Sequence, residues 1–160
     1  MVTTFLALGS NMGDRASFLK KAIEGLAEHG VEIVRRASIY ETEPKDVGAQ
    51  PWFLNTVVEG NTLLEPRALL ECCLSIERKN HRLRREVKSA RTLDIDIVFY
   101  GAEVIDDPFL QVPHPRFSER KFVLMPLAEL APRLIDPKSG RSVASLLQAC
   151  NDVSEVRLLA

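Results

Sequence analysis

The chain has 160 residues, of which 46% are hydrophobic and 27% are charged, and its formal net charge at pH 7 is −1. These values are typical of a globular protein with its own core, and they exclude a disordered or fibrous chain. The balanced charge gives no indication of a nucleic-acid partner or an anionic membrane surface, and apolar runs of only a few residues exclude a membrane-spanning helix. We therefore expect a single domain over residues 1–160.

The N-terminus and the cysteines predict the compartment. No basic segment precedes the short apolar run at the N-terminus, so we expect no signal peptide. Three cysteines, two of them adjacent, do not form a disulfide framework. The sequence lacks CxxC and HxxxH spacings, which argues against structural zinc. Reduced thiols favour a cytosolic protein.

Strand and helix patterns alternate through the first hundred residues. A strand over residues 3–8 is followed by the loop GSNMGD, and a helix capped by Asp14 ends at Gly30. The next predicted elements are a strand over residues 31–40, a strand over 53–59 that ends at Gly60-Asn61, a helix from Pro66 to about Asn80, and a strand over 93–99.

This order predicts an α+β fold with a ferredoxin-like βαββαβ sheet and helices on one face. An extension of roughly sixty residues follows, with short helices expected near residues 124–130 and 143–149. We expect the extension to cover part of the other face of the sheet.

The most unusual strand carries two aspartates in the segment RTLDIDIVFYG. Side chains alternate along a strand, so Asp94 and Asp96 share one face while Leu93, Ile95 and Ile97 share the other. Two like charges on one face repel, and burying them unpaired is costly. Either this face is solvated, or the two carboxylates bind Mg²⁺, which is commonly held by one or two carboxylates together with substrate phosphates.

A basic segment, RKNHRLRREVKSAR, leads into this strand at residues 78–91. Taken alone, such a run is usually a solvated surface. Its position next to the aspartates favours a second interpretation, because cations for phosphate oxygens beside carboxylates for Mg²⁺ are what phosphoryl transfer requires. Arginine provides planar, bidentate donors for phosphate.

Three further segments are candidates for a binding site. Phe53 and Asn55 share a face at the start of a strand, where they suit ring stacking and edge recognition, although an aromatic that caps the core is commoner. VPHPRFSERKF brings His114, Arg116, Arg120 and Phe122 onto an irregular segment, where surface basic residues are also common. GSNMGD lacks the lysine of a phosphate-binding P-loop, and its glycines indicate a tight connection that lets a ligand approach.

Together these segments resemble the 6-hydroxymethyl-7,8-dihydropterin pyrophosphokinase family of folate biosynthesis. The matching stretches are ALGSNMGD, SIYETEP, QPWFLNTVV, the pattern from Glu77 to Arg84, RTLDIDIVFYG, and VPHPR with a downstream RKFVLMPLAELAP. The resemblance implies transfer of the β,γ-diphosphoryl group of ATP to the hydroxymethyl oxygen of the reduced pterin, with release of AMP. It also implies two Mg²⁺ ions, bound by Asp94 and Asp96.

The resemblance assigns further roles residue by residue. Arg82 and Arg91 correspond to cations that assist transfer, and Phe53 and Phe122 to two rings that stack on the pterin. The positions that correspond to nucleotide contacts are Glu77, Arg84, Lys88, Ile97, Gln111, His114 and Arg120. The positions that correspond to contacts with the pterin edge are Thr42, Glu43, Lys45 and Asn55.

One departure and two alternatives accompany this interpretation. Family members commonly carry W-G-P-R where this chain reads Lys88-Ser89-Ala90-Arg91, so the tryptophan that helps to close the basic loop is missing. The alternatives are a ferredoxin-like nucleic-acid-binding domain and a catalytically weakened relative. The partners that we expect are ATP and the pterin, without nucleic acid or membrane, for a monomer in the cytoplasm.

Overall fold

The computed structural model describes residues 1–44, 51–81 and 93–159. The strands of this part of the chain are β1 (Val2–Ser10), β2 (Val31–Arg36), β3 (Tyr40–Thr42), β4 (Phe53–Thr62), β5 (Asp94–Tyr100), β6 (Ile105–Asp107), β7 (Leu110–Val112) and β8 (Val156–Leu158). The helices are α1 (Arg15–Glu28), α2 (Pro66–His81), α3 (Lys121–Leu130) and α4 (Val143–Ala149), with a short 3₁₀ turn, η1 (Phe117–Glu119).

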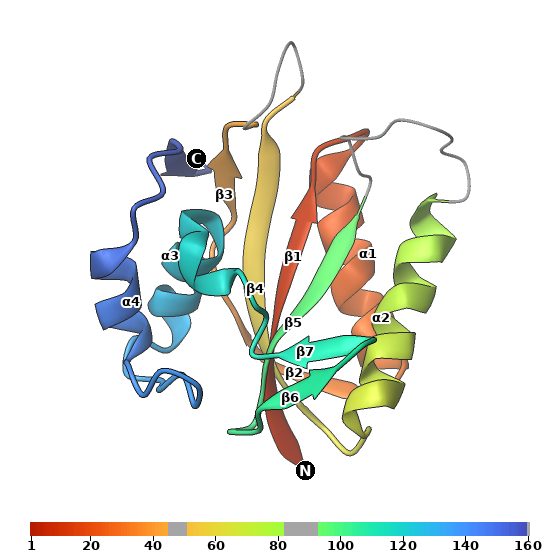
Figure 1. Cartoon of the computed structure of the whole chain (residues 1–160). Helices are drawn as coiled ribbons and strands as arrows, with labels where there is room; N and C mark the ends of the chain where they lie inside the picture. The colour runs from red at the N-terminus through yellow and green to blue at the C-terminus, as the bar shows by residue number, and fades with distance from the viewer. Residues whose placement is uncertain (45–50, 82–92, 160) are drawn as a thin grey trace.

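The main sheet is antiparallel and has the strand order β5-β1-β4-β3-β8, with β2 also paired to β4 (Figure 1). The order β5-β1-β4-β2 is that of a split βαβ repeat, in which the first and third strands of the repeat lie at the centre. The expected α+β fold is therefore confirmed. The β6–β7 hairpin and β8, which pairs with β3, are additions that the sequence patterns did not predict.

The predicted strand over residues 31–40 is in fact two strands. β2 pairs with the Val58–Thr62 end of β4, whereas β3 pairs with its Phe53–Asn55 end. A register shift in β2 between Ile33 and Arg35 precedes the break, and the connection stays attached through the Ala37 amide, which donates to the Val57 carbonyl at 2.9 Å. Alternation along one segment does not reveal such a break, because it depends on the partner strand.

Two predicted strand ends were placed too early. β4 continues through Gly60 to Thr62. At Gly60 the neighbouring strand is so close that an added Cβ would lie 2.5 Å from Val31 Cγ1. The glycine therefore permits close approach of two strands and does not mark a turn. β1 similarly includes Gly9 and Ser10, so the loop begins later than GSNMGD indicates.

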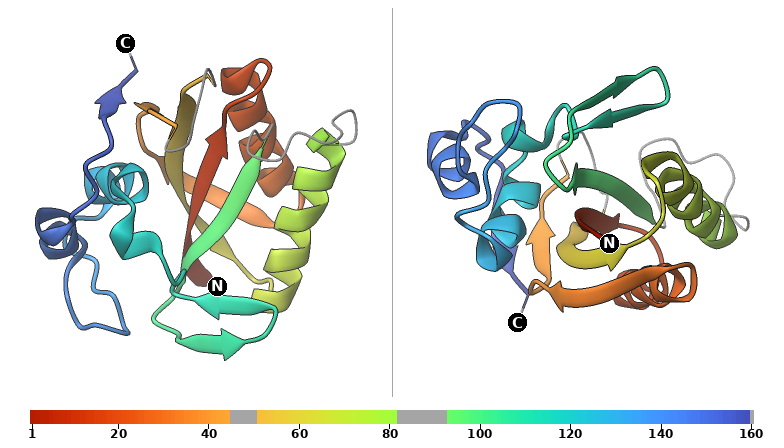
Figure 2. Two further views of the ribbon diagram at one scale, coloured as in Figure 1. Left: turned by 45° about the horizontal axis from the view of Figure 1, so that its top comes forward. Right: turned by 90° about the horizontal axis from the view of Figure 1, so that it is seen from below.

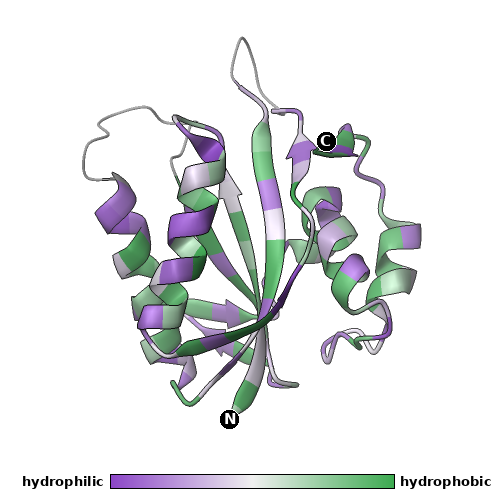
Figure 3. Ribbon diagram, turned by 180° about the vertical axis from the view of Figure 1, so that it is seen from behind, coloured by the Kyte–Doolittle hydropathy of each residue, from purple (hydrophilic) through white to green (hydrophobic). Residues whose placement is uncertain are grey.

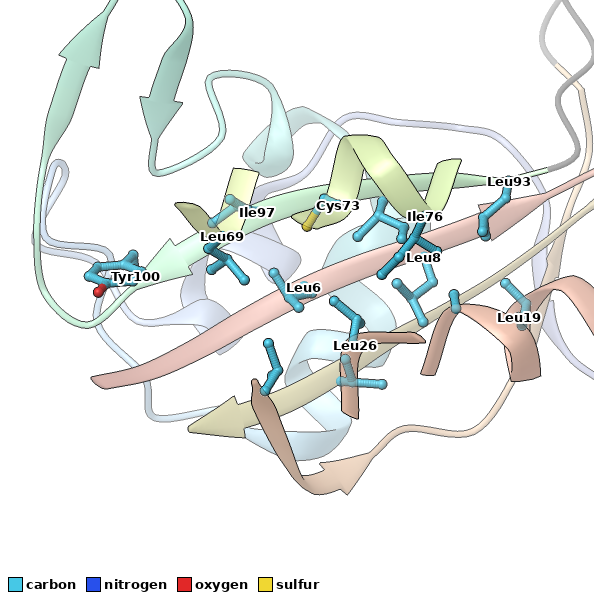
Figure 4. Packing of buried hydrophobic residues seen from close by; sticks show 14 of the residues in the cluster. Leu6, Leu8, Leu19, Leu26, Leu69, Cys73, Ile76, Leu93, Ile97 and Tyr100 are labelled. Atoms are coloured by element: carbon cyan, nitrogen blue, oxygen red, sulfur yellow. The ribbon is translucent and has the colours of Figure 1, made fainter. Parts of the chain in front are cut away.

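The sheet lies between two layers of helices, as the end-on view in Figure 2 shows. α1 and α2 cover one face, where buried leucines and isoleucines of β1 and β5 pack on Leu19, Leu26, Leu69 and Ile76 (Figure 4). Along both helices hydrophobic and hydrophilic residues recur in bands, as expected for helices with one buried face (Figure 3). The Asp14 side chain accepts from the Ser17 amide and caps α1, as predicted.

The C-terminal extension covers the other face, also as predicted. Val123, Leu124 and Leu127 of α3 and Val143 of α4 belong to a second core cluster, which includes Phe5, Val57 and Phe99 of the sheet. The three cysteines are free thiols, and no helix among the described residues is long and apolar enough to cross a membrane.

Candidate functional site

A pocket of about 330 Å³ lies between the sheet and the start of α3. Its volume is within the range of small-molecule sites. The sheet contributes residues from β1, β3, β4 and β5, and the opposite wall is formed by residues 116–123. Eight of the predicted site residues line it, namely Thr42, Glu43, Phe53, Asn55, Asp94, Asp96, Arg120 and Phe122.

The two aspartates project into the pocket from β5. Ile95 and Ile97 are buried on the α1–α2 side, whereas Asp94 and Asp96 are half-buried and line the pocket. The alternation that the sequence predicts is therefore confirmed. In the strand register, Asp94 lies opposite Gly9 and Asp96 lies opposite Ala7 of β1. These small residues leave space beside the carboxylates.

An amide and a hydroxyl lie on the other side of β1. Asn55 of β4 pairs with Gly9, and its Nδ2 donates to Thr42 Oγ1 at 2.9 Å. Both side chains are buried. The hydrogen bond fixes the amide and turns its Oδ1 atom toward Gly9, where an added Cβ would lie only 2.9 Å away. The Asn55 amide is thus held in a fixed orientation at the pocket wall.

Two aromatic rings from distant parts of the chain meet at the pocket. Phe53 begins β4 and is paired with Thr42, while Phe122 lies in the first turn of α3. Both line the cavity and stay partly exposed to it. The Arg120 guanidinium carbon lies 5.7 Å from the centre of the Phe122 ring. A flat heterocycle with polar edges suits a space with aromatic and amide groups.

Glu43 is held by the end of the chain. Its Oε1 accepts from the Glu155 amide at 2.8 Å, and its own amide donates to the Glu155 carbonyl at 3.2 Å. Glu43 and the following Pro44 both line the pocket. The carboxylate is therefore fixed at the pocket wall by a segment that follows it by more than a hundred residues.

His114 lies next to this site without lining it. Its amide donates to the Val98 carbonyl on β5, and its Nδ1 accepts from the Arg116 amide at 3.1 Å. Burial lowers the pKa of His114; nearby Asp96 opposes this shift, and Arg120 and Arg116 add to it. A neutral imidazole that accepts at Nδ1 carries its proton on Nε2, so it can donate to an anionic ligand.

Three other predicted nucleotide positions do not line the pocket. Glu77 Oε2 accepts from the Ile95 amide at 2.6 Å and so joins α2 to β5. The Ile97 side chain is buried in the core between the sheet and the helices, which leaves only its backbone for a ligand. Gln111 is exposed on the β6–β7 hairpin, where its Nε2 lies 3.4 Å from Asp106 Oδ1.

The remaining predictions concern residues that the structure does not describe. They are Lys45, Arg82, Arg84, Lys88 and Arg91, together with the departure at Lys88-Ser89-Ala90. Two further pocket residues, Arg116 and Gly9, belong to the candidate segments VPHPRFSERKF and GSNMGD but were assigned no specific role. Ala7 and Pro44 were not predicted, because small or apolar residues such as these carry no chemical signal in a sequence.

Comparison with known proteins identifies the same family that the sequence motifs resemble. A family model described as 7,8-dihydro-6-hydroxymethylpterin-pyrophosphokinase (HPPK) matches residues 5–132. A 2-amino-4-hydroxy-6-hydroxymethyldihydropteridine pyrophosphokinase of Methylorubrum extorquens is 44% identical over 136 residues, covering 84% of this chain and 86% of the relative. The protein of the same name from Bacillus subtilis is 45% identical over 127 residues, covering 79% and 76% respectively.

Longer relatives contain a similar segment. The chain is 38% identical over 148 residues to the Pneumocystis carinii folic acid synthesis protein fol1, covering 92% of this chain but only 20% of that protein. A crystal structure of wild-type Plasmodium falciparum HPPK-DHPS shares the fold, with a TM-score of 0.69 at 15% identity, covering 92% of this chain and 43% of that one. The chain thus spans less than half of these two proteins.

The family match covers the strands that carry the aspartates and the amide, and it extends through α3, which carries Phe122. The two bacterial relatives are similar over most of their own length. The chain belongs to the 7,8-dihydro-6-hydroxymethylpterin-pyrophosphokinase family.

Proposed function

We propose that the chain transfers the terminal diphosphoryl group of ATP to the hydroxymethyl oxygen of 6-hydroxymethyl-7,8-dihydropterin, a step of folate biosynthesis. The hydroxymethyl oxygen forms a bond to the β-phosphorus of ATP, and the bond between that phosphorus and the oxygen bridging to the α-phosphate breaks. AMP leaves with the bonding electrons, and the hydroxyl proton passes to solvent. Family membership and the pocket that contains Asp94, Asp96, Asn55 and two aromatic rings support this reaction.

The pterin is proposed to bind at the Asn55 side of the pocket. Phe53 and Phe122 would stack on the two faces of the bicycle, and the edge would meet Asn55 and Thr42. One N–H of Asn55 Nδ2 donates to Thr42, so Oδ1 can accept from the ligand and the second N–H can donate to it. Glu43, fixed by the Glu155 amide, provides a carboxylate acceptor at the same wall.

The donor set at Asp94 and Asp96 fits Mg²⁺. Both are half-buried carboxylates that line the pocket from the same strand. Among the described residues there is no cluster of three or more metal-binding side chains, which fits an ion that completes its shell with water and substrate phosphates. When bound, Mg²⁺ neutralises charge on the triphosphate and aligns it with the hydroxyl. We propose two such ions, as the resemblance implies.

The triphosphate is proposed to extend from the aspartates toward the basic residues of segment 114–120. Arg120 lines the pocket, and burial lowers the pKa of His114, which favours the neutral imidazole with its proton on Nε2 as a donor. Arg116 also lines the pocket and adds a third donor group. Arg82, Arg84, Lys88 and Arg91 remain candidates for further phosphate contacts, as do Glu77, Ile97 and Gln111 for the nucleotide. A monomeric state and a cytosolic location also stay predictions.

The observation that carries the proposal is that Asp94 and Asn55 lie on either side of Gly9 of β1, with Asp96 beside Ala7 on the same strand. This arrangement supports the proposal, because carboxylates suited to a cation with bound phosphates lie beside an amide suited to the edge of a flat, polar ring, as transfer between ATP and a pterin requires.

The direct test measures products from ATP, Mg²⁺ and 6-hydroxymethyl-7,8-dihydropterin by chromatography. We expect equal amounts of AMP and pterin diphosphate, and no AMP when the pterin is omitted or Mg²⁺ is chelated. Formation of ADP would contradict diphosphoryl transfer. Absence of both nucleotides, with a folded protein, would support the alternative of an inactive relative.

A further inference from the structure

The last described residues form a strap that connects two walls of the pocket. We define the C-terminal strap as residues 152–158, which include β8. It follows α4, passes α3 and ends beside β3 (Figures 1 and 2). It lies beyond residues 5–132, the range that the family model matches.

The first attachment of the strap is at the N-terminus of α3. Arg120, the N-cap residue of α3, provides no side-chain cap. Asp152 supplies one instead, since its Oδ2 accepts from the Lys121 amide at 3.0 Å. The other oxygen of Asp152 accepts from the amide and hydroxyl of Ser154 at 2.9 and 2.6 Å, which fixes the carboxylate. The capped turn carries Phe122, so the strap is tied to the helical wall of the pocket.

The second attachment is at β3, on the opposite wall. Val156 pairs with Thr42, and Glu155 exchanges two hydrogen bonds with Glu43. Thr42 and Glu43 both line the pocket, and Thr42 also pairs with Phe53. The strap is therefore hydrogen-bonded directly to the pocket wall that carries Phe53.

Arg157 reinforces this second attachment. Its Nε lies 3.3 Å from Glu41 Oε1, and its guanidinium carbon lies 4.2 Å from the centre of the Trp52 ring. Glu41 is in β3, and Trp52 directly precedes Phe53 and β4. Arg157 thus contacts both β3 and the residue that precedes β4, on the pocket wall that carries Thr42 and Phe53. A planar guanidinium can stack on a ring and pair with a carboxylate at the same time, which lysine does not do equally well.

We propose that the C-terminal strap is a positioning element for the pterin: it sets the separation between the walls that carry Phe53 and Phe122. Stacking on both faces of a ring depends on this separation, and small misplacements are costly. The contacts described for the strap lie at the start of α3, at β3 and at Trp52, so we expect it to act more on pterin affinity than on nucleotide affinity. This inference rests on the proposed function.

The test compares the double variant Asp152→Ala/Arg157→Ala with the single variant Arg157→Lys. For the double variant we expect the KM for the pterin to rise about five- to tenfold, the size expected for losing one or two hydrogen bonds that hold binding groups. The KM for ATP should rise less than the KM for the pterin, because the capped turn borders Arg120 but carries Phe122. Arg157→Lys should be intermediate, because it keeps the charge opposite Glu41 but loses the planar stack.

Arg141→Ala is the matched control, because Arg141 also lies in the C-terminal region but hydrogen-bonds to Ser145 of α4. It should leave both KM values unchanged. Binding of 6-hydroxymethylpterin, followed by its fluorescence, should weaken in the double variant by the same factor as KM rises. An active wild type whose variants keep the pterin KM, or lose pterin and ATP affinity equally, overturns the positioning role. A wild type that neither binds the pterin nor makes AMP overturns the proposed function, and this inference with it.

Discussion

Gly9 of β1 and Asn55 of β4 are register partners, and the glycine provides the space that the asparagine side chain occupies. A Cβ at position 9 would lie 2.9 Å from Asn55 Oδ1, while the other end of the amide is held by Thr42. Gly9, the first glycine of GSNMGD, therefore has a specific structural role. Because it lacks a side chain, the Asn55 amide of the neighbouring strand can take up its orientation toward the pocket.

Replacing this glycine should displace the amide. In Gly9→Ala, Asn55 must rotate away from Thr42 or the strands must separate, and overpacking of this kind costs about 1–3 kcal/mol of unfolding free energy. We also expect weaker pterin binding. Denaturant unfolding and pterin titration measure the two effects. In an Asn55→Ala background the same substitution should cost much less, and an equal cost in both backgrounds would show that the contact is not responsible.

The acidic pair gives a prediction in which activity and stability separate. Asp96→Ala should reduce turnover by at least about 10²-fold, because a ligand of the ion that stabilises transferred charge is lost. The unfolding free energy should change little, since removal of the carboxylate also removes repulsion from the neighbouring Asp94. Steady-state AMP formation and urea unfolding test this. Glu103→Ala, at an exposed position between β5 and β6, is the control, and near-normal turnover of Asp96→Ala would contradict the metal role.

Glu77 should show a structural contribution in addition to its predicted nucleotide contact. Its Oε2 accepts from the amide of Ile95, a buried residue. Glu77→Ala leaves this donor without that acceptor and should cost about 1–3 kcal/mol of unfolding free energy. Glu77→Gln keeps an acceptor oxygen and should lose less stability, while the loss of charge tests the nucleotide contact through the KM for ATP. Equal destabilisation by both variants would mean that the charge, and not the acceptor, supports β5.

A pH-dependent contribution is expected where α3 meets β3. The Tyr40 hydroxyl donates to Glu129 Oε1 at 2.7 Å, and the Ser38 amide and hydroxyl donate to the same carboxylate. Burial, followed by the Glu129 carboxylate, raises the pKa of Tyr40 to about 12. Burial alone would raise the pKa of Glu129, but the hydrogen bonds outweigh it and hold that pKa below its ordinary value of 4.5.

Tyr40→Phe should therefore cost about 1 kcal/mol at neutral pH, a value reduced for the exposure of Glu129. A lowered carboxyl pKa stabilises the fold above 4.5, and this contribution is lost as the pH falls through the folded pKa. A raised tyrosine pKa stabilises the neutral form, and that contribution is lost as the pH rises above 10. Unfolding curves of both proteins across this range should converge at the two ends. A difference independent of pH would exclude this hydrogen bond as the cause.

Several parts of the fold could be predicted because they depend on local periodicity. The alternation of charged and apolar residues around Asp94 and Asp96 has the period of a strand, so it fixes which side chains face the core and which face the pocket. The Asp14 cap and the buried stripe of α1 follow from equally local rules. The division of residues 31–40 into two strands could not be predicted, because it depends on how β4 changes partner along its length.

The candidate site also combines features that the sequence predicts with features that depend on the folded chain. By itself, the sequence determined the types of the main elements, the shared face of the two aspartates and the resemblance that named the reaction. Only the tertiary structure decided that Phe53 and Phe122 line one pocket, that Gly9 makes room for Asn55, and that residues 152–158 connect the two walls. The physical reason is that side-chain alternation is a property of neighbouring residues, whereas a pocket is made by segments that meet only after strands pair and helices pack.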